Sequence, residues 1–290
     1  MKQIIIYISA ILGLFSGCKP QSNKTTDITT SIPPQKYFIE QLIGTETPIN
    51  VMITSGNNHA NYEPTPKQLQ AITTSKIYVK IGELGFENIW LGKILELNPS
   101  IIIVSLSDSI SPIYGGESCD HDDHHSHEEG IDPHIWTSPK TVKSIIPNLA
   151  NALTKLYPDK RELIAKNLTQ LTLKISSLNK RLDEVTRNAK TKKFIIFHPG
   201  YAYLARDYGL EQIAIEKDGK EPSAGYLVEL INLAKESSIK TIFIQEEFDK
   251  RNGELLAKSI KGEFVIVNPM NENWFEEMNS MIDKLDKALN

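Results

Sequence analysis

Five of the seven histidines in this 290-residue chain fall within one short stretch. Imidazole is the commonest protein ligand for zinc and its transition-metal neighbours, and carboxylates beside it supply further donors. Residues 117–136 combine both kinds of side chain, and the histidines among them are His121, His124, His125, His127 and His134. The chemistry that this composition predicts is the binding of a metal ion.

The first part of this stretch, residues 117–129, holds six acidic residues, four histidines and Cys119. A segment so polar cannot bury enough apolar surface to fold by itself, so we expect a disordered loop. A flexible, negative and imidazole-rich loop beside a tight site would collect Zn²⁺ weakly and raise its local concentration. We therefore hypothesise a secondary, low-affinity metal site, formed by His121, His124, His125 and His127.

Three histidines outside that loop are candidates for one tight site. His59 and His198 stand at the ends of predicted strands, and His134 follows the acidic loop. In open α/β sheets, ligands gather beyond the carboxyl ends of strands. Three neutral imidazoles satisfy most of the tetrahedral donor set that zinc prefers. Their spacing alone is equally compatible with ordinary structural histidines.

The elements that must position these side chains alternate along the chain. Short apolar runs alternate with amphipathic segments, which predicts an α/β protein with mostly parallel strands. Apolar residues spaced 4-3-4-3 from Ile164 to Val185 predict one helix over about residues 159–189, roughly 45 Å long at ~1.5 Å per residue. A coiled coil is the alternative for this spacing. Because strand patterns occur on both sides of it, we expect a single helix that lies across both halves of the protein and is long enough to bridge two domains.

This reading divides the chain into five consecutive parts. They are a signal peptide at 1–17, a lipidated flexible tether at 18–30, an N-terminal α/β lobe at 31–157 with its histidine-rich loop at 117–129, a linker helix at 158–190 and a C-terminal α/β lobe at 191–290. The polar, unpatterned composition of residues 21–30 is the reason for the tether.

The amino terminus predicts export. Lys2 precedes an apolar run from Ile4 to Phe15, which is too short to cross a bilayer and has the order of a signal peptide. The run ends in Ser-Gly-Cys, which resembles a bacterial lipobox and predicts lipidation of Cys18. A plain secretory signal with an incidental cysteine is the alternative. We therefore expect a membrane-anchored protein of the cell envelope, facing the periplasm or the cell exterior.

Charge and missing motifs exclude several classes of function. The chain carries 32 basic and 36 acidic residues, and this mildly acidic balance argues against a nucleic-acid partner. The sequence contains no HExxH, GxSxG or GxxxxGK[ST] motif. A zinc-dependent hydrolase is the alternative enzyme class, since catalytic zinc also uses three protein ligands, but no motif here supplies its general base. A metal-buffering or adhesion protein of the cell surface is a further alternative.

Four motifs occur in order along the chain, and together they resemble one protein family. They are PPQKYF at 33–38, YEPTP at 62–66, DPHIWTSP at 132–139 and FHPGYAYL at 197–204. They resemble the metal-binding lipoproteins of bacterial zinc and manganese ABC importers, the ZnuA-like or cluster A-I solute-binding proteins. The resemblance covers residues 31–290 and is specific, because four separate motifs coincide.

The resemblance implies a fold of two α/β, Rossmann-like lobes joined by one long rigid helix, and it implies a function as well. It implies a monomeric solute-binding protein that is not an enzyme, captures Zn²⁺ in the cleft between its lobes and delivers it to an ABC permease. The family's second and third ligands fall on His134 and His198. Its first ligand position is occupied by Ala60, so His59 must be aimed inward by a small adjustment of its loop. A histidine at the third position and an acidic histidine-rich loop are typical of zinc-type members, and a manganese-selective member is the alternative.

The fourth ligand is left open by the sequence. The family's late acidic position falls on Asn268, a neutral and weaker donor, and a glutamate common in the family is replaced by Gln245. Three histidines completed by water, Glu246, Glu247 or Asn268 are therefore expected. Loop glutamates are more often solvated charges than ligands.

Overall fold

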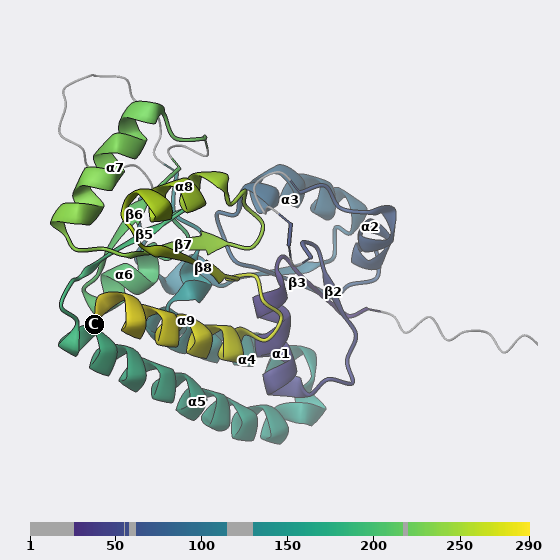
Figure 1. Ribbon diagram of the computed structural model, residues 1–290. Helices are drawn as coiled ribbons and strands as arrows, with labels where there is room; N and C mark the ends of the chain where they lie inside the picture. Colours follow the sequence, from purple (N-terminus) through teal and green to yellow (C-terminus); the bar gives the residue numbers. More distant parts are fainter. Residues whose placement is uncertain (1–25, 55, 58–61, 115–129, 217–219) are drawn as a thin grey trace, which may run out of the picture.

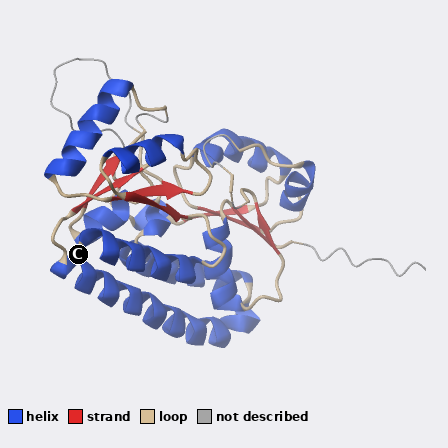
Figure 2. Cartoon of the chain, viewed as in Figure 1, coloured by secondary structure: helices blue, strands red, loops and turns tan. Residues whose placement is uncertain are grey.

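The structure, a computed structural model, describes residues 26–54, 56–57, 62–114, 130–216 and 220–290. In this part of the chain two α/β lobes are each built around a four-stranded parallel sheet. Figure 1 shows the two lobes side by side, with one long helix running beneath both. Figure 2 shows the strands in two groups, with helices around them. The predicted fold class is confirmed.

The N-terminal lobe has the strand order β2-β1-β3-β4. Its strands are β1 (Ile28–Thr30), β2 (Ile49–Val51), β3 (Ile77–Lys80) and β4 (Ile102–Ser105). Its helices are α1 (Pro33–Ile43), α2 (Pro66–Ile72), α3 (Gly85–Leu97) and α4 (Pro139–Leu156), with 3₁₀ turns at Ser107–Ser109 and Ile135–Thr137.

The C-terminal lobe repeats this arrangement with the order β6-β5-β7-β8. Its strands are β5 (Lys193–Ile196), β6 (Glu211–Ala214), β7 (Thr241–Gln245) and β8 (Glu263–Val267). Its helices are α6 (Ala202–Tyr208), α7 (Ala224–Glu236), α8 (Arg251–Ser259) and α9 (Trp274–Leu289).

The long helix predicted from apolar spacing is α5 (Arg161–Asn188), which follows a 3₁₀ turn at Pro158–Lys160. At ~1.5 Å per residue it is about 42 Å long. It packs against α1 and α4 of the first lobe and α9 of the second, as Figure 1 also shows. Its buried apolar residues are Ile164, Leu171, Ile175, Leu178 and Leu182. The seam therefore faces other helices of the same chain, not a partner in a coiled coil.

Three helices begin at the polar caps that their sequences predict. The Thr65 side chain accepts a hydrogen bond from the Gln68 amide, and Pro66 occupies the first helical position. Ser138 caps α4 in the same way, again followed by a proline. Ser223 caps α7 by accepting from the Tyr226 amide. These starts are local, so the sequence alone was sufficient to place them.

One expectation about an element was wrong, and one helix was not predicted. Residues 28–30, assigned to the flexible tether at 18–30, form β1, which lies between β2 and β3 with its residues fully buried. A three-residue strand is too short to show a hydrophobic period, and pairing on both sides stabilises it instead. The helix α8 was not predicted, because its few apolar residues lie among charges.

The two lobes share one apolar core. The buried cluster that contains the first lobe's β-strand residues continues through α5 to α9 and β5. At the junction, Phe38 of α1 packs edge-to-face against Trp274 of α9, with ring centroids 5.0 Å apart. A second cluster lies within the C-terminal lobe, between its sheet and the helices α7 and α8. Separating the lobes would expose apolar surface, so the structure favours small relative movements.

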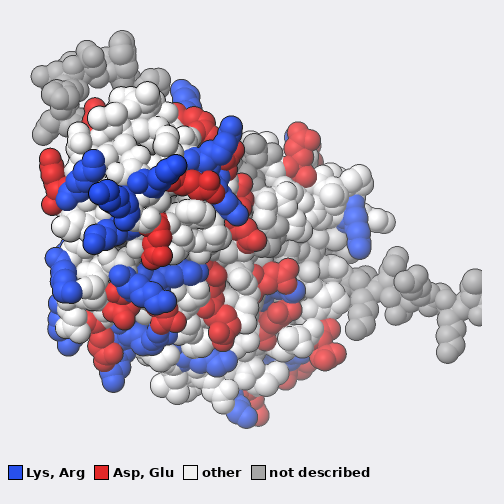
Figure 3. Space-filling model, viewed as in Figure 1, with Lys and Arg blue, Asp and Glu red and all other residues white. Residues whose placement is uncertain are grey.

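On the face drawn in Figure 3, basic and acidic side chains are interspersed, so neither sign of charge dominates there. Among the described residues, no helix has the length and apolar character needed to cross a membrane. Residues 1–17, predicted to be a signal peptide, and Cys18 lie outside the described residues.

Candidate metal centre

His198 lies two residues beyond the end of β5, at the carboxyl edge of the C-terminal sheet. Its backbone is fixed from the neighbouring strand by Gln245, the last residue of β7. The His198 amide donates to Gln245 Oε1 over 3.1 Å, and Gln245 Nε2 donates to the His198 carbonyl over 2.6 Å. Gln245 is fully buried. The position of His198 is therefore set by the parallel pairing of β5 with β7.

His134 reaches the same place from a different kind of segment. It follows the acidic loop in the sequence, and in the structure it lies between an isolated bridge at Ile131 and the 3₁₀ turn Ile135–Thr137. Asp132 holds it there: its Oδ1 accepts from the His134 amide over 2.7 Å and bonds His134 Nδ1 over 2.8 Å. A carboxylate that bonds the backbone two residues ahead replaces the strand as the support.

The two imidazoles meet at their Nε2 atoms, which are 3.3 Å apart. The ring centroids are 5.1 Å apart and the ring planes cross at 72°. Two nitrogens bound tetrahedrally to one zinc, with Zn–N bonds of about 2.0–2.1 Å, lie roughly 3.3–3.4 Å from each other. The observed separation is thus the edge of such a tetrahedron.

Each ring has a carboxylate on its other nitrogen. Asp132 faces Nδ1 of His134, and Glu216 Oε1 lies 2.5 Å from Nδ1 of His198. Both carboxyl groups are mostly buried, with 10% and 7% of their side chains exposed. An ionised carboxylate accepts the Nδ1 proton, and a neutral ring then has its lone pair on Nε2, the form that binds metals. This arrangement puts the lone pair of each ring on the nitrogen at which the two rings meet.

Sequence reasoning missed these supporting residues. Asp132 had a local signal, because a carboxylate two residues before a histidine can bond the backbone that carries the ring. Glu216 had none: it follows β6, and only the pairing of β6 with β5 brings it to His198. Gln245 was noticed as a substitution for glutamate, but its two hydrogen bonds to the His198 backbone were not predicted.

Aromatic rings and one glycine enclose the two histidines. Phe248 stacks on His198 with centroids 5.1 Å apart, and Trp136 lies 5.2 Å from His134. A Cβ added at Gly200 would lie 3.6 Å from both imidazole rings, so the backbone there runs against the pair. The His134 side chain is 6% exposed and that of His198 is 20% exposed. The pair is therefore partly shielded from water, which strengthens electrostatic interactions.

The three protein candidates for a fourth ligand directly follow two strands: Glu246 and Glu247 follow β7, and Asn268 follows β8. Asn268 is engaged twice: its Nδ2 donates to Glu246 Oε2 over 2.6 Å, and its Oδ1 accepts from the Met270 amide. Glu247 is half-buried, contrary to the expectation of a solvated charge. Burial raises its pKa, and a hydrogen bond with its own backbone opposes the rise. Within the described chain, Glu247 Oε2 is a buried oxygen without a hydrogen-bond partner.

The structure thus brings together two of the three predicted ligands. His59 lies outside the described residues, as do His121, His124, His125 and His127 of the loop. Among the residues that are described, no three His, Cys, Asp or Glu side chains already form a group able to hold a metal. Within the described chain, the two imidazoles therefore supply only part of a tetrahedral donor set.

Comparisons with known proteins agree with this arrangement. The family model described as zinc-uptake complex component A, periplasmic, matches residues 28–288. The zinc-binding lipoprotein AdcA of Streptococcus pneumoniae strain R6 is 30% identical over 281 residues, covering 93% of this chain. The high-affinity zinc uptake system protein ZnuA of Bacillus subtilis is 26% identical, covering 97% of this chain and 92% of its own length. The chain spans 56% of the length of AdcA.

Solved structures give the same result. A crystal structure of ZnuA superposes with a TM-score of 0.82 at 34% identity, covering 91% of this chain and 99% of the other. The Zn(II)-bound ZnuA-like domain of Streptococcus pneumoniae AdcA gives a TM-score of 0.72 at 27% identity, covering 90% and 97%. With its sheets, its paired histidines and these matches in agreement, the chain belongs to the family of zinc-uptake complex component A proteins.

Proposed function

We propose that this protein is the zinc-binding, solute-binding component of an ABC-type importer. It captures Zn²⁺ between its lobes and delivers it to a membrane permease, and it is not an enzyme. The observation that carries the proposal is the 3.3 Å separation of the Nε2 atoms of His134 and His198, which suits one tetrahedral zinc. Imidazole donors favour zinc over manganese, which prefers oxygen ligands. The zinc-related names of the relatives support the same cargo.

The ligand set that we propose is His59, His134 and His198, with Glu247 as the fourth donor. Of the four candidates for that place, Glu246 and Asn268 already bond each other. Glu247 has a buried oxygen with no partner among the described residues, and it lies near His134. A buried carboxylate oxygen needs a cation, a proton or a water as partner, and a zinc ion beside it supplies one. Water is the competing fourth ligand.

Metal analysis of the purified protein, followed by titration against a chromophoric chelator, tests the function. We expect one tightly bound zinc per chain. His198→Ala should weaken it on the order of 100-fold or more, since replacing mere supporting residues already costs 10–100-fold. The matched control is His125→Ala in the loop, which should leave the tight site unchanged. A wild-type protein that binds no zinc tightly would overturn the proposal.

Variants of two adjacent glutamates distinguish the candidates for the fourth ligand. Glu247→Gln should weaken zinc binding about tenfold, because a neutral amide is a poorer zinc ligand than a carboxylate. Glu246→Gln, one residue away, should change the affinity by less than about twofold. If both variants bind zinc as the wild type does, the fourth ligand is water.

The acidic loop and the lipid anchor complete the proposal. The loop histidines at 121–127 form weak accessory sites, so deletion of residues 119–129 should remove the weak phase of a calorimetric titration and leave the tight site. Lipidation of Cys18 holds the protein at the cell envelope as a monomer beside its permease. A Cys18→Ser variant should accordingly leave the membrane fraction of the producing cells, and its retention there would contradict the anchor.

A further inference from the structure

The turn that carries His134 precedes α4 in the sequence, but its hydrogen bonds reach into the C-terminal lobe. Tyr203 of α6 donates its hydroxyl to the Asp132 carbonyl over 3.0 Å. The Trp136 indole donates to the Pro269 carbonyl over 2.8 Å, and the Trp274 indole donates to the Trp136 carbonyl over 2.7 Å. Both indoles are almost fully buried. The turn is thus held on both sides by residues that follow α5.

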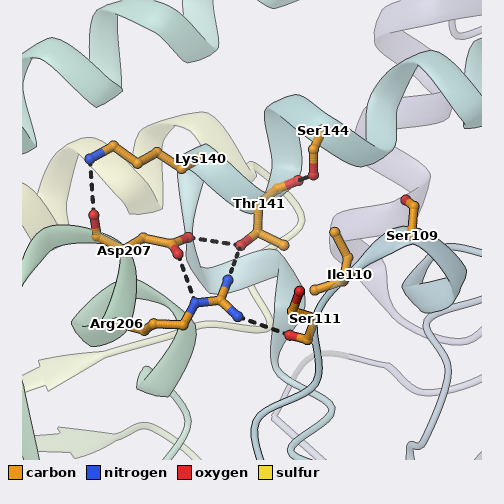
Figure 4. A pocket seen from close by; sticks show the side chains of 8 residues that line it. All are labelled: Ser109, Ile110, Ser111, Lys140, Thr141, Ser144, Arg206 and Asp207. Atoms are coloured by element: carbon orange, nitrogen blue, oxygen red, sulfur yellow. Dashed lines mark hydrogen bonds and ion pairs between the residues drawn. The ribbon is translucent and has the colours of Figure 1, made fainter.

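Asp207, at the end of α6, holds the far end of the same turn. Its Oδ2 accepts from Ser138 Oγ over 2.5 Å and from Thr141 Oγ1 over 2.9 Å. Its Oδ1 accepts from Arg206 Nε over 2.9 Å. Figure 4 shows Asp207 and Arg206 reaching across to Thr141 on α4. The carboxylate lies at the N-terminus of α4, where the helix dipole favours a negative charge.

The connection from this anchor to the ring is short and tight. Only three residues separate His134 from Ser138, and they form a 3₁₀ turn. Within it, the Thr137 hydroxyl donates to the His134 carbonyl over 2.8 Å. Because this connection is short and hydrogen-bonded, a shift of Ser138 would also shift His134. Hydrogen bonds to a charged carboxylate are also stronger than neutral ones.

The same short helix holds the chain before the acidic loop. Arg206 Nη1 donates to the Ser111 carbonyl over 2.9 Å, and the Tyr203 hydroxyl accepts from the Ile113 amide over 3.3 Å. Figure 4 shows this contact between Arg206 and Ser111. The segments on either side of residues 115–129 are therefore both bonded to α6.

We propose that Asp207 and Tyr203 are positioning residues for zinc binding, which fix His134 to the lobe that carries His198. The proposal rests on the proposed function and adds to it. The two imidazoles form one half of the metal site before zinc binds. Both are held by the C-terminal lobe, although His134 precedes α5 in the sequence. When the lobes shift, this pair of imidazoles stays together.

Asp207→Ala tests the proposal, with Asp183→Ala as the matched control. Asp183 accepts from Lys140 over 2.9 Å, close to the same network, but it lies on α5 and, within the described part of the chain, makes no hydrogen bond to the His134 turn. We expect Asp207→Ala to raise the Kd for zinc about tenfold and the control to change it less than twofold. With Co²⁺ in place of zinc, the visible absorption bands should change intensity in Asp207→Ala only, because they report the ligand geometry. Asp207→Asn, which keeps an acceptor, should restore most of the affinity.

A double-mutant cycle separates positioning from general stability. In a His134→Ala background, Asp207→Ala should no longer affect zinc affinity, while its effect on urea unfolding should persist. Affinity that falls equally in both backgrounds would overturn the proposal, as would an unchanged Kd and Co²⁺ spectrum in the single variant. A wild-type protein without tight zinc would instead contradict the proposed function, so the two failures are distinguishable.

Discussion

The two sheets have the same strand order, yet the residues beyond their carboxyl edges serve different ends. In the N-terminal lobe, Glu87 accepts hydrogen bonds from the amides of Ile81 and Gly82, both over 2.7 Å, and from the Ser31 hydroxyl. Gln35 accepts from the Ser31 amide over 2.9 Å and donates to the backbone of β3. Both side chains are almost fully buried. Polar groups at this edge are used to satisfy the backbone.

At the edge of the C-terminal sheet, one side chain has that task and others are left for chemistry. Gln245 bonds the backbone of His198, much as Gln35 and Glu87 bond the backbone in the first lobe. The imidazole that this clamp supports then meets His134. In a parallel sheet, loops converge at the carboxyl edge. The residue types in those loops determine whether the edge is part of the core or forms a binding site.

The largest effect that we expect from this difference is on stability. Glu87→Ala should lower the free energy of unfolding by about 3–5 kcal/mol, because it leaves two buried amides without acceptors. Zinc affinity of the folded protein should change less than about threefold. Urea denaturation and chelator competition measure the two quantities. Glu96→Ala, an exposed site on the same helix, is the control. A large loss of affinity in Glu87→Ala would break the comparison.

In the C-terminal lobe the corresponding change should act on the metal. Glu216→Ala removes the carboxylate beside His198 Nδ1, and we expect a 10–100-fold rise in the Kd for zinc, the usual effect of losing a support of this kind. Glu211→Ala is the control, since that carboxylate pairs with Lys193 on the exposed strand edge. Equal affinities for the two variants would show that Glu216 does not orient the ring.

A smaller effect is expected from Asp132→Asn. The amide oxygen can still accept from the His134 backbone, while the negative charge that favours the Nδ1-protonated ring is lost. We expect the Kd for zinc to rise about tenfold or less. Competition titrations would measure it, and a loss as large as that of Glu216→Ala would mean that charge outweighs backbone support at this histidine.

The smallest effect concerns pH. Burial raises the pKa of Glu87, and hydrogen bonds from Ser31, Ile81 and Gly82 oppose the rise. Since the folded-state pKa lies above the unfolded value of about 4.5, the folded protein binds this proton more tightly, and the stabilisation is complete below that pH and lost as pH rises through the raised pKa. Denaturation of wild type and Glu87→Gln from pH 4 upward should give a stability difference that declines with pH. A rising difference would contradict the assignment.

The sequence was most informative where structure is local. The caps at Thr65 and Ser138 and the seam of α5 depend on neighbours within a few residues, and their helices were predicted. β1 was missed because its stability comes from β2 and β3, which lie far along the chain. The hydrophobic periodicity of a segment does not report its pairing with strands that lie far along the chain.

The candidate site divides in the same way. The meeting of His134 with His198 was predicted from motifs, and the structure brings these two rings together. Glu216 was not predicted, because only the order of the strands places it beside His198. The half-buried state of Glu247 was missed for a similar reason, since burial depends on what packs over a turn. The assignment of these side chains as ligands stays a prediction.

The apolar core that runs from β1 through α5 to α9 also determines how the molecule melts. Because the lobes share this core, neither half can lose its packing without exposing the other, so heat should unfold the chain in a single cooperative transition. A bound ion contacts only a few side chains, yet it would raise the melting temperature of the whole molecule. Either half expressed by itself would carry the bare face of that core and would tend to aggregate.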